Sequence, residues 1–148
     1  MSIRPKYIEA LSILERTSPI KYYDNKQLTD MAMNSRIGSK FNICDSYDLF
    51  EPNNRKPYSI LNTDDSSSSG THWVAVYQDG PYMLVYDSFA RSKRLMKPFV
   101  DMMKKQGFEV VFVNRGKDQS DEQLNCGLRS LLYLIFVDKY GIRKSLSI

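Results

Sequence analysis

Apolar and polar positions in the middle of the chain follow the short period of β-strands. Valine, tyrosine and leucine are concentrated in two runs, 73–77 and 82–86, which flank a turn sequence at 78–81. That turn contains an Asp-Gly pair, a strong signal for a β-hairpin, so we expect the two runs to be antiparallel neighbours. Two more short strands are predicted at 58–62 and 109–114.

The longer period of α-helices marks four other segments. Apolar residues spaced by three predict a helix at 7–15, and a threonine suited to an N-cap opens a short helix at 29–34. An amphipathic helix is predicted at 95–105, where apolar residues alternate with lysines. The last helix starts near Cys126 and continues until Gly141 stops it, and its regular apolar spacing predicts a place in the core.

The chain of 148 residues predicts one domain, 1–148, large enough to bury a core without metal or disulfides. The stretch of aspartate and serine at 64–70 is too short for a linker between domains and predicts a surface loop. No apolar run approaches the roughly 20 residues of a membrane helix, and the polar start lacks the apolar core of a secretory signal. We therefore expect an intracellular monomer that does not bind membranes.

Composition narrows the chemistry further. Two cysteines and one histidine cannot form a four-ligand zinc site or a disulfide framework, so no metal is predicted. The net charge is +4 and the pI about 9.0, which permits binding to nucleic acid but does not require it. A solvated mixed surface and a nucleic-acid-binding face both remain open. The basic residues of the second half are Arg91, Lys93, Arg94, Lys97, Lys104, Lys105, Arg115, Lys117, Arg143 and Lys144.

His72 is the only histidine, so any chemistry that needs an imidazole near neutral pH must use it. Asp87 follows the second run of the predicted hairpin, one strand away. Its carboxylate could accept the Nδ1–H of His72 and leave Nε2 facing a thiol. A structural histidine and an ordinary turn aspartate are the alternatives.

Cys126 is predicted in the first turn of the buried helix, where unpaired N–H groups favour a thiolate. Gly127 has no side chain, so a substrate carbonyl could approach the helix start closely. Gln119, a few residues earlier, could donate to the oxyanion of a tetrahedral intermediate together with the Cys126 N–H. A buried structural cysteine and a solvated loop glutamine are the alternatives. Cys44 has no comparable setting and is predicted to be a small core residue.

The order of these four residues and their local contexts resembles the adenovirus proteinase (adenain) family of viral cysteine proteases. Gln119 precedes Cys126 by seven positions, which suits that family, whereas Gln123 is too close to be the preferred donor. The similar motifs are Ile-Leu-Asn-Thr at 60–63, Gly-Thr-His-Trp at 70–73, Tyr-Asp-Ser-Phe at 86–89, Gln-Ser at 119–120 and Asn-Cys-Gly at 125–127.

The resemblance implies an α+β fold with a papain-like cysteine protease core in permuted order. His72 and Asp87 would lie on a β-sheet packed against the helix that begins with Cys126. The implied activity is that of a cysteine endopeptidase that cleaves virion precursor proteins during particle maturation. Catalysis would use a Cys126, His72 and Asp87 triad with Gln119 in the oxyanion hole. Substrate would be bound by Asn125, Gly127 and Trp73, and a plain core role for the tryptophan is equally open.

Two departures from the family limit what carries over. The adenovirus enzyme is activated by a peptide bound through a disulfide to a cysteine between its acid and its nucleophile, and no cysteine lies between Asp87 and Cys126. No cofactor is therefore implied beyond an open choice of a non-covalent peptide or DNA activator. The chain also ends soon after the cysteine helix, which predicts a smaller version of the fold.

The partners implied by the resemblance are viral precursor polypeptides, with DNA left open, in the virion and in the nucleus or cytoplasm of the host cell. Two alternatives remain. One is a protease for ubiquitin-like protein conjugates, although those enzymes usually place the glutamine six residues before the cysteine, where this chain has Ser120. The other is a basic nucleic-acid-binding or capsid-associated protein whose site is catalytically silent.

Overall fold

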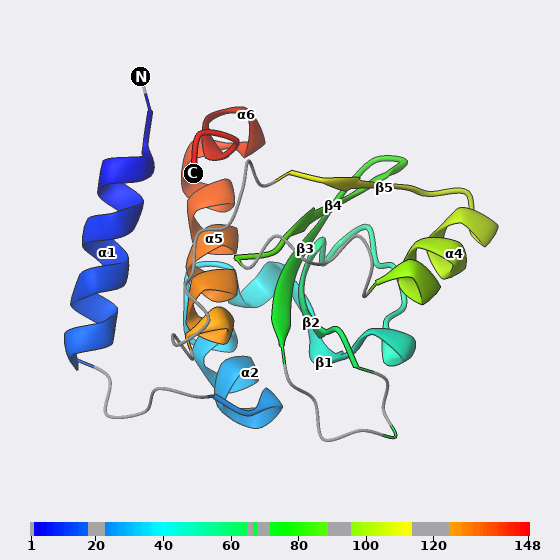
Figure 1. Ribbon diagram of the computed structural model, residues 1–148, viewed down its shortest axis with the longest axis horizontal. Helices are drawn as coiled ribbons and strands as arrows, with labels where there is room; N and C mark the ends of the chain where they lie inside the picture. The colour runs from blue at the N-terminus through cyan, green and yellow to red at the C-terminus, as the bar shows by residue number, and fades with distance from the viewer. Residues whose placement is uncertain (1, 18–22, 65–66, 68–71, 89–95, 114–124) are drawn as a thin grey trace.

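The computed structural model describes residues 2–17, 23–64, 67, 72–88, 96–113 and 125–148. They form a five-stranded mixed sheet with helices, which confirms the predicted α+β class (Figure 1). The helices are α1 (Arg4–Thr17), α2 (Asn25–Met33), α4 (Lys97–Lys105), α5 (Cys126–Tyr140) and α6 (Ile142–Ser145), with 3-10 turns η1 (Gly38–Lys40) and η2 (Tyr47–Leu49). The strands are β1 (Phe41–Ser46), β2 (Tyr58–Asn62), β3 (Trp73–Asp79), β4 (Tyr82–Tyr86) and β5 (Glu109–Phe112).

The strands lie in the order in which they occur in the chain. The two edge pairs, β1 with β2 and β4 with β5, are parallel, while β3 is antiparallel to both of its neighbours. The predicted hairpin is confirmed: Asp79 pairs with Tyr82 across a two-residue turn. Gly80 has φ of 56° in the first position of that turn, a left-handed conformation that glycine adopts without strain.

Helix α5 is the centre of the fold. It is buried along 11 of its 15 residues, so it is covered on nearly all sides rather than on one face. The sheet covers one side of it and α1 lies on the other, as Figure 1 shows. Helix α1 is held there by Tyr7, whose ring packs edge-on against Phe136 at 5.6 Å and whose hydroxyl donates to the Arg129 carbonyl at 3.2 Å.

The other face of the sheet carries a second apolar cluster under α4. Phe99 and Met103 of α4 are fully buried there with Val74 and Val85 of the sheet. Strand β3 is therefore buried on both faces, which explains its nearly continuous apolar sequence. No helix among the described residues is long and apolar enough to cross a bilayer.

The structure differs from the predicted elements at the start of α1, which is Arg4 rather than Tyr7, in the unpredicted helix α6, and in two further places. Helix α2 begins at Asn25 rather than Thr29, because Asp24 accepts a hydrogen bond from the Gln27 N–H and the Gln27 side chain accepts one from the Asp24 N–H. This reciprocal pair is a capping box, a stronger start signal than a lone threonine. Strand β1 was not predicted, because its exposure does not alternate along the strand.

Candidate active site

His72 and Asp87 lie at the same end of the β3–β4 hairpin. His72 immediately precedes β3, and its carbonyl accepts a hydrogen bond from the Thr63 N–H at 3.0 Å, which fixes its backbone beside the end of β2. Asp87 immediately follows β4. Antiparallel pairing brings these two strand ends together, and the His72 Nε2 is hydrogen-bonded to the Asp87 Oδ1. Both residues are buried, with exposed fractions of 4% and 0%.

Cys126 is the first residue of α5 and is 3% exposed. The Ser130 hydroxyl, one turn further along the helix, lies 2.8 Å from the Cys126 carbonyl oxygen and 3.3 Å from the Trp73 carbonyl oxygen. Because Trp73 directly follows His72, this hydroxyl ties the cysteine end of the helix to the histidine end of the strand. The start of α5 is thus held beside the start of β3.

Electrostatic effects on His72 reflect both of its neighbours. Burial lowers the pKa of His72, but the hydrogen bond to the Asp87 carboxylate and the neighbouring Cys126 outweigh that effect and raise the pKa from 6.5 to about 9. The imidazole is therefore mainly protonated at neutral pH. The structure brings together three of the four residues that the sequence nominated for catalysis.

The ring of His72 is oriented opposite to our expectation. Nε2, not Nδ1, is hydrogen-bonded to the Asp87 carboxylate. Nε2 is the ring nitrogen farther from the backbone, and Asp87 follows the neighbouring strand, so the far nitrogen is the one that reaches the carboxylate.

Cys44 has a different environment. It lies in β1 within the main apolar cluster and is 5% exposed. Burial raises the pKa of its thiol to about 12, against a smaller lowering by a hydrogen bond with Thr29. This agrees with the predicted core role.

Trp73 and Gly127 pack against each other at the start of α5. Trp73 is 5% exposed, and its indole N–H donates to the Tyr23 carbonyl at 3.1 Å. A Cβ atom on Gly127 would lie 2.9 Å from Leu28 Cδ1 and 3.2 Å from Trp73 Cδ1. The side of Gly127 that we expected to admit a substrate carbonyl is therefore filled, and the glycine permits close packing with α2 and β3. Substrate contacts of both residues stay a prediction.

Asn125, also nominated for substrate binding, is the N-cap residue of α5, yet its side chain makes no hydrogen bond to its own helix. Its Nδ2 donates to Glu15 of α1, and its Oδ1 accepts from Arg129 Nε at 2.9 Å. Sequence reasoning missed both partners. The i,i+4 spacing of Asn125 and Arg129 was a usable signal, but nothing in the sequence pointed to Glu15, 110 residues away.

Gln119 lies outside the described residues, as do Ser120 and Gln123, so the oxyanion donor stays a prediction. Over the parts of the chain that the structure describes, no group of three or more His, Cys, Asp or Glu side chains could hold a metal ion. The sequence matches no protein-family model, and a search of the curated proteins finds no match.

Proposed function

We propose that this protein is a cysteine endopeptidase that uses Cys126 as nucleophile and His72 as the acid and base. The observation that carries the proposal is the buried His72 imidazole, which is hydrogen-bonded to the Asp87 carboxylate and lies close enough to Cys126 for that residue to raise its pKa. A nucleophile beside a base that is itself oriented by a third group is the common arrangement of covalent hydrolases. The position of the sulfur at the start of a 15-residue helix adds to this support.

In the first half of the reaction, the Cys126 thiolate attacks the carbonyl carbon of a peptide bond. A C–S bond forms, and the carbonyl electron pair moves to oxygen. The Cys126 N–H, and Gln119 by prediction, donate to this oxyanion. When the intermediate collapses, the C–N bond breaks and the His72 imidazolium gives its proton to the leaving amine.

In the second half, the neutral His72 takes a proton from water as the water oxygen attacks the thioester. The C–S bond breaks, the carboxylic acid leaves, and the thiolate and imidazolium are restored. Asp87 acts on the ring throughout: its hydrogen bond and charge favour the protonated imidazole and fix the orientation of the ring. The raised pKa of His72 keeps a proton on the imidazole that can pass to the leaving amine.

The packing of the helix on the sheet supports a papain-like core. Helix α5, which begins with the nucleophile, packs mainly on β3, which His72 precedes. Together with the sequence motifs, this extends the proposal to an adenain-like protease of permuted order, with virion precursor polypeptides as substrates. A non-covalent peptide or DNA activator belongs to the same proposal. Because Cys126 is only 3% exposed, a substrate can reach the sulfur only after neighbouring groups move.

The proposal is tested by incubating the full chain with a peptide library whose amino termini are chemically blocked, and by mapping new amino termini by mass spectrometry. We expect new termini with the wild-type chain and none after treatment with iodoacetamide. The Cys44→Ala chain is the matched control and should produce the same termini. Cleavage that survives replacement of Cys126 by alanine would exclude the proposed nucleophile.

A further inference from the structure

Two helices begin near the site, and the N-cap side chain forms a cap hydrogen bond in one of them but not in the other. At α2, Asp24 accepts from the Gln27 N–H at 2.8 Å, so the first turn is capped. At α5, Asn125 occupies the equivalent position but makes no cap hydrogen bond. Asparagine is among the strongest N-cap residues, so its failure to cap this helix requires a cause.

Two features account for it: Asn125 has ψ of 25°, whereas the capping Asp24 is extended with ψ of 176°, and both ends of the Asn125 amide are bound elsewhere. Arg129, itself only 5% exposed, donates from Nε to the Asn125 oxygen, the atom that would otherwise accept from the helix. Glu15 reaches across from α1 and accepts from the Asn125 nitrogen. The two contacts act on opposite ends of one amide group, and together they hold it away from the first turn of α5.

The missing cap hydrogen bond affects Cys126, the residue that follows Asn125. A capping oxygen would accept a hydrogen bond from the N–H of Gly127 or Leu128 and would reduce the partial positive charge at the helix start. Without it, this charge is available to the Cys126 sulfur and to the carbonyl that the sulfur attacks. Among the residues that the structure describes, the charged groups around the helix start include His72 and Asp87 from the sheet, Glu15 from α1 and Arg129 from α5 itself.

We propose that Glu15 is a positioning residue for the nucleophile: it holds the Asn125 side chain out of the cap position, so that the N–H groups at the start of α5 remain available to Cys126. This inference rests on the proposed function for its purpose, but not for its measurement. It also gives α1 a role in the site, because the Glu15 carboxylate on that helix binds Asn125, the residue before Cys126.

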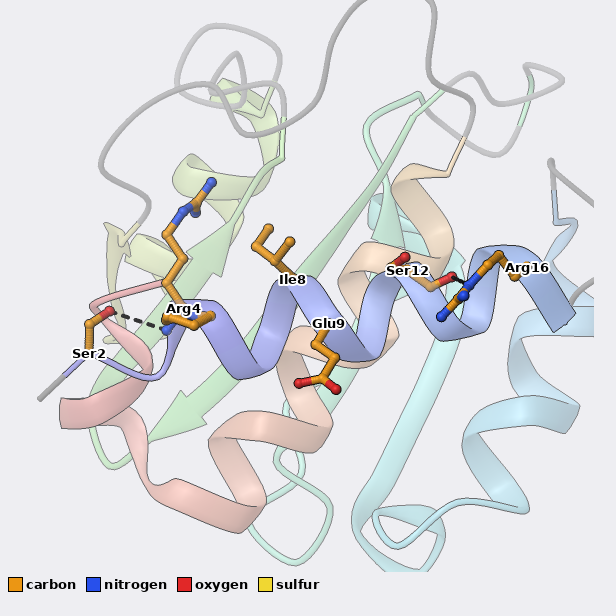
Figure 2. A pocket seen from close by; sticks show the side chains of 7 residues that line it. Ser2, Arg4, Ile8, Glu9, Ser12 and Arg16 are labelled. Carbon is orange, nitrogen blue, oxygen red and sulfur yellow. Dashed lines mark hydrogen bonds between the residues drawn. The ribbon is translucent and has the colours of Figure 1, made fainter.

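The same helix offers a matched control. Its outer face bears a shallow pocket, and Figure 2 shows the Glu9 side chain there. Glu9 and Glu15 are both exposed glutamates of α1. Replacement of Glu9 by alanine therefore makes the same chemical change on the same helix without touching Asn125.

The test measures the rate at which iodoacetamide alkylates Cys126 as a function of pH, with the modified peptide identified by mass spectrometry. The midpoint of this profile reports the sulfur's environment and does not depend on how easily the reagent enters. In Glu15→Ala, Arg129 alone still binds the Asn125 amide, whose oxygen can accept a second hydrogen bond, so Asn125 can turn to cap the helix. The midpoint should then rise by about 0.2 to 0.7 pH units, which means about 2- to 5-fold slower alkylation below the midpoint. Glu9→Ala should leave the midpoint unchanged.

A second variant separates positioning from simple charge. Glu15→Gln keeps a side-chain oxygen that can accept from Asn125 but removes the negative charge. We expect its midpoint to match the wild type. If the carboxylate acted only through space, both Glu15 variants would lower the midpoint, and that result would overturn the inference.

The decisive control is a double variant. In an Asn125→Ala background there is no side chain to cap the helix, so adding Glu15→Ala should produce no further shift. The inference would also be overturned if Glu15→Ala still shifted the midpoint in the Asn125→Ala background. It would equally be overturned if Glu15→Ala alone caused no shift. A merely structural Glu15 would lower the thermal midpoint, whereas a newly capped helix should not. Because alkylation requires no peptide substrate, failure of the protease proposal would show separately as absent cleavage.

Discussion

Cys126 and Cys44 are almost equally buried, at 3% and 5% exposure, and belong to the same apolar cluster, yet their polar neighbours differ. Cys44 lies in the middle of an edge strand among apolar side chains, and burial raises its thiol pKa to about 12. Cys126 lies at the uncapped start of α5 with the His72 imidazole beside it. The comparison teaches that neighbours, rather than burial, distinguish a reactive thiol from a structural one.

The same contrast extends to nearby carboxylates. Asp24 and Asp45 act on Cys44 directly and raise its pKa further. Asp87 instead contacts His72, which lies between it and Cys126. A negative charge placed next to a sulfur disfavours the thiolate. The same charge favours the thiolate when it stabilises an imidazolium that lies between the two.

Replacing the two cysteines in turn should have the largest effect on this comparison. Cys126→Ala removes the nucleophile and should lower kcat by about 10⁴- to 10⁶-fold, the range seen when a catalytic nucleophile is lost. Cys44→Ala should change kcat less than about 3-fold and should mainly lower the thermal midpoint. The check is the rate of peptide cleavage in the two purified variants. Equal losses in both would remove the distinction between the sites.

Loss of the imidazole should have the next largest effect. His72→Ala leaves no other histidine in the chain, and kcat should fall by about 10²- to 10⁴-fold, the usual contribution of general acid–base catalysis. Steady-state kinetics would measure this. A variant that retained more than a tenth of the wild-type kcat would show that Cys126 does not depend on the imidazole.

Asp87→Asn should weaken the site by a smaller factor and should also change its pH dependence. Because His72 gives up its proton near its pKa of about 9, kcat/KM of the wild-type chain should fall as the pH rises through about 9. The neutral amide no longer favours the imidazolium, so this alkaline limb should move to lower pH. A pH profile of kcat/KM for both chains checks this, and an unmoved limb would contradict the role of the carboxylate.

The raised pKa of His72 also predicts a trend in stability. Protonated His72 stabilises the folded chain fully below its unfolded pKa of about 6.5, and this contribution is lost as the pH rises through about 9. Relative to His72→Asn, the wild-type thermal midpoint should therefore decline between these pH values. If the thermal midpoints of the two chains changed with pH in parallel, the raised pKa of His72 would be contradicted.

The packing beside Cys126 predicts the smallest effect. Gly127→Ala places a methyl group 2.9 Å from Leu28 Cδ1 and should destabilise the fold by about 1 kcal/mol, because crowding exceeds the gain in helix propensity. In a Leu28→Ala background the same change should stabilise the fold, by less than about 1 kcal/mol because the new methyl group still lies 3.2 Å from Trp73 Cδ1. Urea denaturation of the four chains tests this. The same sign in both backgrounds would show that Leu28 is not what requires the glycine.

Much of the fold followed from sequence pattern because its main elements are locally encoded. The hairpin was predicted from two strand-like runs and an Asp-Gly turn, and α5 from the spacing of its apolar residues. Strand β1 escaped prediction because its exposure does not alternate, and the start of α2 because a capping box outweighed a threonine.

The candidate site also has a part that the sequence predicts and a part that it does not. His72, Asp87 and Cys126 could be nominated because each has a distinctive local context and because histidine occurs once. The orientation of the imidazole, the packing reason for Gly127 and the contact from Glu15 depend on how distant segments dock, and no local pattern encodes them.

The most direct test of the account is a competition between the two thiols in one sample. The folded chain is treated with limiting iodoacetamide between pH 6 and 7, and modification at Cys126 and Cys44 is compared by mass spectrometry. We expect Cys126 to be modified at least about 100-fold faster, and His72→Ala to remove most of this preference. Equal rates, or faster modification of Cys44, would contradict the assignment of Cys126 as an activated nucleophile.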